Sequence, residues 1–349
     1  MFKGIKIDNY RGIKQTEITD LSRVNLFFGK NNCGKSSILE SIFLITGQSN
    51  PVLPIITNRM RGITTVNESI LALDFYAANP KNAIHIITDG EPKRELLIEL
   101  IQSNSHDIVL SDLDLGKSDA TKQFYGIKMS YKLNGNDSVY SSNLLVSGDN
   151  TENAKVNIDK RYKENIISQY ITSNYMQNQS AIVEDLSKII QQKQESDIID
   201  ILHIIEPRIQ NIQVVGSDIL VDVGLDKRLP INVLGDGIRK VLSLIVAVFE
   251  CAKGVLIIDE MDNGLHYSVM SKLWRAIISA ANKYDVQLFI STHSIDLLKS
   301  LSLSFDINGS DEPSVSLYKL IRMQDDVVQA LKYGVDDIQY AISQEIEIR

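Results

Sequence analysis

The chain has 349 residues, of which 44% are hydrophobic and 23% are charged, and its formal net charge is −8. This composition is typical of a globular protein with one large domain or two interleaved ones, and the acidic balance argues against a surface that binds nucleic acid on all sides. Two cysteines, Cys33 and Cys251, imply no disulfide framework. The apolar run at 241–249 is far shorter than the roughly 20 residues that span a bilayer, so we expect a cytoplasmic protein without a membrane partner.

The first 62 residues predict strands, a helix and a loop. Apolar and polar residues alternate over 2–8, a second strand runs through 13–18, and an apolar run over 24–28 predicts a third. Apolar residues from Ile38 onward then predict a helix that ends near Gly47. Residues 48–62 contain Pro51 and Pro54, and we expect a surface loop there.

The stretch between the third strand and the helix reads GKNNCGKSS, residues 29–37. It matches the phosphate-loop pattern GxxxxGK[ST], in which Gly29 and Gly34 let successive amides face inward at a helix N-terminus. Lys35 can then reach the β- and γ-phosphates of ATP, and the Ser36 hydroxyl can bind Mg²⁺. The residues assigned to nucleotide binding are Gly29, Lys30, Asn31, Asn32, Cys33, Gly34, Lys35, Ser36 and Ser37.

The middle of the chain divides into strands and then helices. Runs at 70–76, 83–88, 95–102, 124–133 and 139–146 are separated by turn residues, and we expect them to form an antiparallel meander. A polar linker follows at 148–155. Residues 162–205 show apolar residues at helical spacing and predict helices, without the sustained heptads of a coiled coil.

The last third alternates strands with helices. Short strands are expected at 209–215 and 219–223, and LGDGIRK at 234–240 opens an apolar helix that ends at Cys251. The strand VLIIDE at 255–260 precedes a helix over 267–284, and the strand at 286–290 leads into STHS. A helix, a strand at 315–321 and a final helix complete the prediction.

Two of these strands end in residues that suit phosphate chemistry. Asp259 would bind Mg²⁺ opposite Ser36, and Glu260 would polarise the attacking water. His293 could bond the γ-phosphate or that water. A lone histidine is more often structural, as we expect for His85, His106 and His203, but the strand end favours a catalytic role for His293.

LGDGIRK offers a second anion-binding helix N-terminus, formed by Leu234, Gly235, Asp236 and Gly237. One phosphate loop already encloses one side of a triphosphate. We therefore expect this element to bind the nucleotide of another subunit, and an ordinary helix cap is the alternative.

Together these motifs resemble the ABC-type ATPases, specifically the SMC, RecF and OLD-like branch often labelled AAA family ATPases. The resemblance makes residues 29–37 the Walker A motif, LGDGI the signature, VLIIDE the Walker B motif and His293 the switch histidine. It implies an α/β fold of the P-loop NTPase type, an ABC-type ATPase head with an antiparallel β subdomain and an inserted helical segment. The core would comprise residues 1–65 and 207–349, the β subdomain 66–150 and the helical segment 151–206. It also implies a homodimer that encloses ATP, with Mg²⁺, between Walker A of one subunit and the signature of the other, and this dimer could assemble further.

Several features narrow the placement. The 199-residue interval from Lys35 to Leu234 is about twice that of transporter subunits, and His266 stands where transporters often have aspartate. Arg11 in NYRG resembles the arginine that SMC relatives place near the nucleotide or DNA. Gln169 and Gln177 are both candidates for the Q-loop glutamine. The 56 residues after His293 are too few for a Toprim nuclease domain, so we expect a stand-alone ATPase.

Three functions are compatible with this resemblance. The preferred one is an ATP-hydrolysing dimeric switch that controls a separately encoded effector, a nuclease or toxin, in bacterial antiphage defence. The second is a DNA repair or recombination ATPase similar to RecF, for which the net charge of +5 over residues 1–65 could face DNA. The third is a scaffold that ATP assembles and that turns over little. A transporter subunit fits least.

Overall fold

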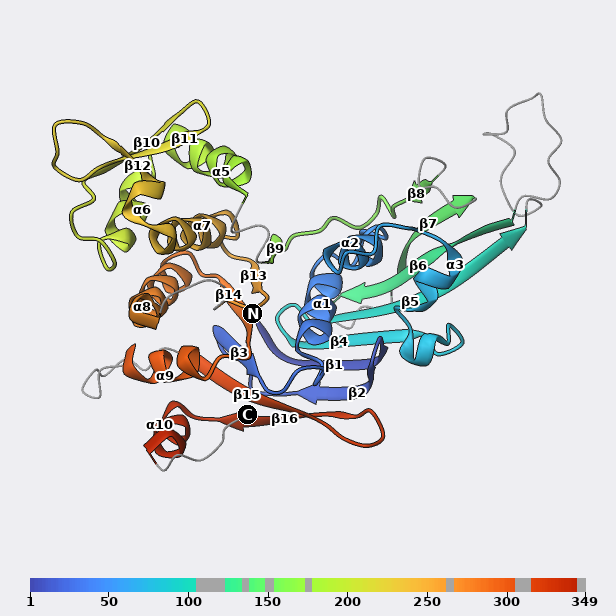
Figure 1. Ribbon diagram of the computed structural model, residues 1–349. Coiled ribbons are helices and arrows are strands. Elements are labelled where there is room, and N and C mark those ends of the chain that lie inside the picture. Colours follow the sequence, from blue (N-terminus) through green and yellow to red (C-terminus); the bar gives the residue numbers. More distant parts are fainter. Residues whose placement is uncertain are drawn as a thin grey trace, which may run out of the picture. The chain divides into compact units, whose positions relative to one another are not determined.

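The structure is a computed structural model that describes residues 1–104, 123–133, 138–147, 154–172, 178–261, 267–304 and 315–343 (Figure 1). The chain forms two compact units that are each discontinuous in sequence. Unit 1 comprises residues 1–20, 40–165 and 322–329, and unit 2 comprises residues 21–39, 166–321 and 330–349. The four consecutive segments proposed from the sequence stay a prediction.

Unit 1 contains an antiparallel sheet. Seven strands of its described residues have the order β2-β1-β4-β5-β6-β7-β8 (Figure 1). The neighbours β4 to β7 confirm four of the five strands of the predicted meander. Burial alternates along β4, as expected for a strand with one face on the core. The strands are β1 (Phe2–Tyr10), β2 (Ile13–Ile18), β4 (Ile84–Gly90), β5 (Arg94–Asn104), β6 (Gln123–Leu133), β7 (Tyr140–Ser147) and β8 (Lys155–Asn157).

Two predictions in unit 1 are wrong. Residues 48–62, expected to be a surface loop, contain the helix α2 (Leu53–Met60), in which Pro54 occupies the first turn, where proline is compatible with a helix. Residues 70–76, expected to be a strand, contain part of α3 (Glu68–Ala72) and the 3₁₀ turn η1 (Tyr76–Ala78). The Asn67 side chain accepts a hydrogen bond from the Ile70 amide and so caps α3, because a local cap outweighs the strand propensity of a short apolar run.

Unit 2 is built on a largely parallel sheet. Six strands of the described residues have the order β16-β15-β3-β14-β13-β9, and β15, β3, β14, β13 and β9 pair in parallel (Figure 1). Every residue of β3, β13 and β14 is buried, as parallel strands require. The strands are β3 (Val24–Phe28), β9 (Ser168–Ile171), β13 (Val255–Ile258), β14 (Gln287–Thr292), β15 (Val315–Arg322) and β16 (Val328–Tyr333). The turn that joins β15 to β16 belongs to unit 1.

The helices of unit 2 match the sequence prediction, but two strands of this unit were missed. Residues 162–205 were expected to be helical throughout, yet β9 precedes the two helices of this segment, and β16 was not predicted. The helices are α1 (Lys35–Thr46, in unit 1 from Glu40), α5 (Gln179–Gln191), α6 (Glu195–Leu202), η5 (Ile231–Leu234), α7 (Asp236–Glu250), α8 (Tyr267–Lys283), α9 (Ile295–Ser304) and α10 (Val335–Ser343). A small sheet contains β10 (Asn211–Val215), β11 (Asp218–Asp222) and β12 (Leu229–Pro230).

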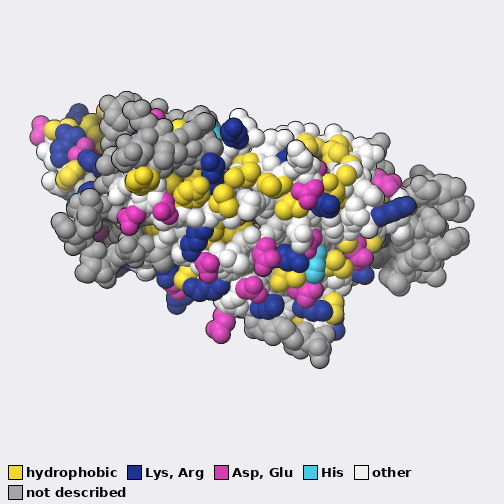
Figure 2. All heavy atoms as spheres, turned by 90° about the horizontal axis from the view of Figure 1, so that it is seen from below, with side chains coloured by type: hydrophobic (Ala, Val, Ile, Leu, Met, Phe, Trp, Pro, Cys, Tyr) yellow, Lys and Arg dark blue, Asp and Glu magenta, His cyan; other side chains and the backbone are white. Residues whose placement is uncertain are grey.

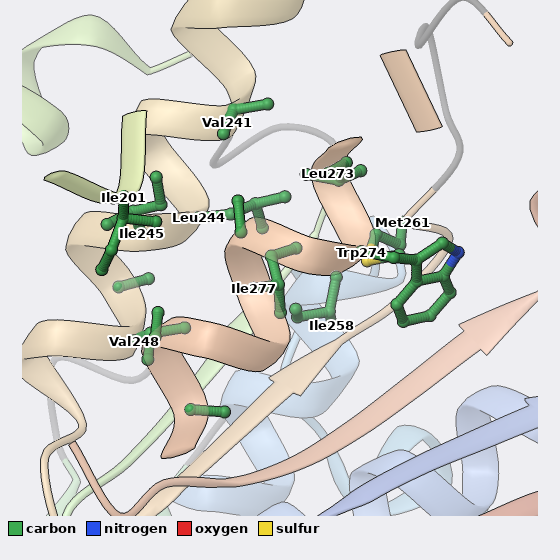
Figure 3. Packing of buried hydrophobic residues seen from close by; sticks show 14 of the residues in the cluster. Ile201, Val241, Leu244, Ile245, Val248, Ile258, Met261, Leu273, Trp274 and Ile277 are labelled. Carbon is green, nitrogen blue, oxygen red and sulfur yellow. The ribbon is translucent and has the colours of Figure 1, made fainter. Parts of the chain in front are cut away.

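The core of unit 2 joins α6, α7, α8 and β13. Figure 3 shows apolar side chains of α7 directed toward those of α8 and β13, with Ile201 of α6 beside them. The α7 residues follow the spacing of one helix face, and this face packs against α8. The labelled residues are Ile201, Val241, Leu244, Ile245, Val248, Ile258, Met261, Leu273, Trp274 and Ile277. This packing fixes the end of β13 and the start of α7 within one unit.

Both cysteines are free and buried, so no disulfide constrains the fold. Within the described residues, no helix combines the length and apolar character that crossing a bilayer requires.

Candidate nucleotide-binding site

The predicted motifs meet at one edge of the parallel sheet of unit 2. Residues 29–37 follow β3, the acidic pair Asp259 and Glu260 follows β13, and His293 follows β14, which lies between those two strands. Phe28 is in register with Thr292, and Ile258 with Ile290. Because parallel strands end at the same edge, the structure brings the loop, the acidic pair and the histidine together.

The loop has the backbone shape that phosphate binding requires. Gly29 and Gly34 have φ angles of 144° and 103°, and Asn32 has a φ angle of 63°. A Cβ atom on Gly29 would lie 2.7 Å from the carbonyl oxygen of Leu320, so this position accepts only glycine. The Nζ atom of Lys35 lies 2.8 Å from the carbonyl oxygen of Gly29 and 2.9 Å from that of Lys30. The lysine ammonium therefore lies at the loop itself, where a phosphate would replace these carbonyl contacts.

Hydrogen bonds hold the acidic pair at the end of β13. The hydroxyl of Tyr170 on β9 donates to Asp259 Oδ2 over 3.0 Å, and the hydroxyl of Ser291 on β14 donates to Asp259 Oδ1. The amide of Glu260 in turn donates to Ser291 Oγ over 2.9 Å. Glu260 has a φ angle of 56° and an exposed side chain.

His293 faces the second carboxylate of the pair. Its Nδ1 atom lies 3.9 Å from Glu260 Oε1, and both side chains are 50% exposed. Ser294 follows, and its hydroxyl accepts a hydrogen bond from the Leu297 amide at the start of α9. His293 thus lies between the end of β14 and the start of α9.

The residues at this edge fit a magnesium nucleotide. The Ser36 hydroxyl at the start of α1 and the Asp259 carboxylate are the oxygen donors that Mg²⁺ prefers. Among the described residues, no three His, Cys, Asp or Glu side chains cluster as a metal site.

The signature residues begin α7. Leu234 ends η5, Gly235 is exposed with a φ angle of 105°, and α7 starts at Asp236, with Gly237 half-buried. Their role at the nucleotide of a second subunit stays a prediction.

Arg11 belongs to unit 1, where its guanidinium is buried. Its Nε atom lies 2.8 Å from Glu40 Oε2, and its Nη2 atom lies 3.2 Å from Asp74 Oδ1. Glu40 is on α1, about one helical turn after Ser36. Arg11 thus has carboxylate partners within its own unit, and its proximity to a nucleotide or DNA stays a prediction.

The Q-loop and distal-loop candidates are only partly within the described residues. Gln169 lies on β9, and its Oε1 atom is 4.0 Å from the sulfur of Cys251. Gln177 and His266 lie outside the described residues.

The sequence did not identify Tyr170 and Ser291 as site residues. Ser291 stands two residues before His293, so the period of a strand could have placed both on one face. Tyr170 gave no comparable signal, because its segment was predicted to be helical.

Comparison with known proteins identifies the family. Residues 24–299 match the family model described as "AAA domain, putative AbiEii toxin, Type IV TA system". The chain belongs to this family. The match includes the phosphate loop, the signature residues, the acidic pair and His293, and this AAA domain is an ABC-type ATPase of the SMC and RecF branch, as predicted from the motifs.

Individual relatives agree with this placement. This chain is 25% identical to a protein named "ATP/GTP phosphatase" from Helicobacter pylori over 374 aligned positions, which cover 99% of each chain. It is 28% identical to the DNA replication and repair protein RecF of Ruminiclostridium cellulolyticum over 116 residues, 33% of this chain and 27% of that protein. An SMC head solved with the C-terminal winged-helix domain of ScpA superposes with a TM-score of 0.51 at 12% identity, covering 97% of this chain and 99% of that one. The α/β fold of a P-loop ATPase head is therefore confirmed.

Proposed function

We propose that this chain binds ATP with Mg²⁺ and hydrolyses it to ADP and phosphate. The observation that carries the proposal is the arrangement at one sheet edge, where a phosphate loop, an acidic pair and a histidine follow neighbouring parallel strands. The name of the Helicobacter pylori relative, which aligns over nearly the whole chain, supports phosphatase activity on a nucleotide.

Each residue of the site has its own role in the proposed ATP hydrolysis. The amides of residues 29–37 and the Lys35 ammonium bind the β- and γ-phosphates, and Ser36 and Asp259 hold Mg²⁺, which neutralises phosphate charge when bound. Glu260 accepts a proton from the water whose oxygen bonds to the γ-phosphorus, while the bond from that phosphorus to the β–γ bridging oxygen breaks and ADP leaves. His293 bonds a γ-phosphate oxygen next to Glu260.

The proposal includes a switch made of two copies of the chain. Leu234 to Gly237 of one copy would cover the nucleotide bound by the other, so that ATP closes a homodimer and hydrolysis opens it. By analogy with stand-alone relatives, the dimer would act in the cytoplasm and control a separately encoded effector, a nuclease or toxin, in antiphage defence. The toxin system named in the family description is compatible with this setting.

Steady-state hydrolysis tests the catalytic part. Lys35→Ala removes the phosphate ligand and Glu260→Gln removes the base, so we expect each to lower kcat by at least about 100-fold. Lys81→Ala and Glu184→Gln, which change exposed side chains elsewhere, should retain wild-type rates. A wild-type protein without hydrolysis under any condition, or full activity in Glu260→Gln, would contradict the proposal.

A second candidate is a DNA-repair ATPase, favoured by the RecF match and by the basic balance of residues 1–65. Figure 2 shows Lys and Arg side chains interspersed with Asp and Glu on one face, with neither sign gathered in a continuous patch. Salt-dependent binding of duplex DNA that requires ATP would support this candidate.

The scaffold is a separate alternative. Retention of partner binding and cellular function by Glu260→Gln would support it.

A further inference from the structure

Ser291 makes two hydrogen bonds with the acidic pair and a third with Met261. Its hydroxyl donates to Asp259 Oδ1 and accepts from the Glu260 amide at 2.9 Å. Its carbonyl oxygen accepts from the Met261 amide at 3.3 Å. The side chain is fully buried on β14, next to β13 in the sheet. One serine thus bonds three consecutive residues after β13.

The backbone at Glu260 requires such support. A φ angle of 56° lies in the left-handed region, which non-glycine residues adopt at a cost and keep only where neighbouring groups impose it. The hydrogen bonds that the Glu260 and Met261 amides donate to Ser291 fix this turn. The direction of the Glu260 side chain therefore depends on Ser291.

Tyr170 completes the arrangement from the other neighbouring strand. Its hydroxyl donates to Asp259 Oδ2, so the two carboxylate oxygens are held from β9 and from β14. Tyr170 therefore orients the carboxylate of Asp259, whereas Ser291 bonds both that carboxylate and the backbone of Glu260.

We propose that Ser291 and Tyr170 are positioning residues of the ATPase site, with Tyr170 orienting the Mg²⁺-binding carboxylate of Asp259 and Ser291 orienting both that carboxylate and the Glu260 base. The inference rests on the proposed ATP hydrolysis. The hydroxyl groups of Tyr170 and Ser291 bond the same aspartate but should affect hydrolysis differently. This difference distinguishes a positioning role from a general contribution to stability.

The test compares Tyr170→Phe and Ser291→Ala, each of which removes one hydroxyl. We expect the Mg²⁺ concentration for half-maximal hydrolysis to rise about 10-fold in both, because the metal ligand loses an orienting bond. At saturating Mg²⁺, Tyr170→Phe should retain kcat. Ser291→Ala should lower kcat by about 10- to 100-fold, because the backbone of Glu260 loses the hydrogen bond that orients this base. Calorimetric titration with ADP gives a readout without turnover: affinity in EDTA should be unchanged, and the gain in affinity on adding Mg²⁺ should shrink in both variants.

Matched controls remove hydroxyl groups of the same kind elsewhere. Ser316→Ala changes a buried serine of β15 whose hydroxyl lies 2.8 Å from that of Ser22, and Tyr131→Phe changes a buried tyrosine that bonds Ser142 in unit 1. Both should match the wild type in kcat and in Mg²⁺ requirement.

The outcomes separate this inference from the proposed function. A wild type that hydrolyses ATP, together with both variants at wild-type kcat and Mg²⁺ requirement, would overturn the positioning roles and leave the ATPase intact. A wild type that binds no ADP would refute the ATPase itself. Unchanged ADP affinity in EDTA shows that a variant is folded, and if Ser291→Ala does not fold, Tyr170→Phe still decides the role at Asp259.

Discussion

Asp74 is a buried carboxylate of unit 1 with a guanidinium beside it. The Nη2 atom of Arg11 lies 3.2 Å from its Oδ1, and the Asn58 amide donates to its Oδ2 at 3.0 Å. Burial raises the pKa of Asp74 from 3.8 to about 7, although the Arg11 charge acts to lower it. The folded protein therefore binds this proton more tightly than the unfolded chain does. The resulting stabilisation is present at low pH and is lost as the pH rises toward 7.

Replacing this carboxylate should change the pH dependence of stability. Between about pH 4 and pH 7, we expect the Asp74 titration to lower the free energy of unfolding by up to about 1.4 kcal/mol per pH unit. Asp74→Asn keeps an acceptor for Asn58 but cannot titrate, so this decline should flatten. Urea unfolding at pH 5, 6 and 7 measures the slope, with Asp285→Asn, an exposed carboxylate, as control. An equal slope in wild type and Asp74→Asn would contradict the expectation.

At the scale of elements, α1 connects the phosphate loop to unit 1. Its first residues are Lys35 and Ser36, and at its other end the guanidinium of Arg94 on β5 donates to the carbonyl oxygens of Ile45 and Thr46 at 3.2 Å. Arg94 is fully buried and pairs with Glu164 at 2.7 Å. Arg94 thus satisfies carbonyl groups that the end of a helix leaves without partners.

Removing the Arg94 charge should therefore destabilise the fold. Arg94→Met removes the donor to the helix carbonyls and the cationic partner of the half-buried Glu164, and we expect the free energy of unfolding to fall by about 3–5 kcal/mol. Arg208→Met, which breaks an exposed pair with Glu206, should cost less than about 1 kcal/mol. Equal and small losses for the two variants in urea unfolding would show that Arg94 does not secure α1.

Local sequence determines some elements better than others. The strand before Gly29 and the helix after it could be predicted because apolar period, glycine positions and helix start agree over one continuous stretch. The strand β9 could not, because four residues without a clear period follow a segment that reads as helical, and pairing with β13 decides its conformation. The helix α2 could not be predicted for a different reason, because a proline is compatible both with a loop and with the first turn of a helix.

At the scale of the whole molecule, the motifs that meet at one sheet edge could be predicted, whereas the hydroxyl groups that bond Asp259 could not. Lys35, Asp259 and Glu260 belong to motifs whose spacing carries the chemistry. The contacts of Ser291 and Tyr170 arise only when β9, β13 and β14 pair in one sheet, and no local pattern encodes that pairing.

The proposed dimer is tested most directly by the molar mass of Glu260→Gln protein, measured by light scattering with and without Mg²⁺-ATP. This variant should bind ATP without consuming it, so we expect the mass to double on adding Mg²⁺-ATP and to stay that of one chain with Mg²⁺ alone. Lys35→Ala combined with Glu260→Gln should remain monomeric throughout. A mass that does not change with ATP, in protein shown to bind the nucleotide, would contradict the proposal that ATP closes a dimer through residues 234–237.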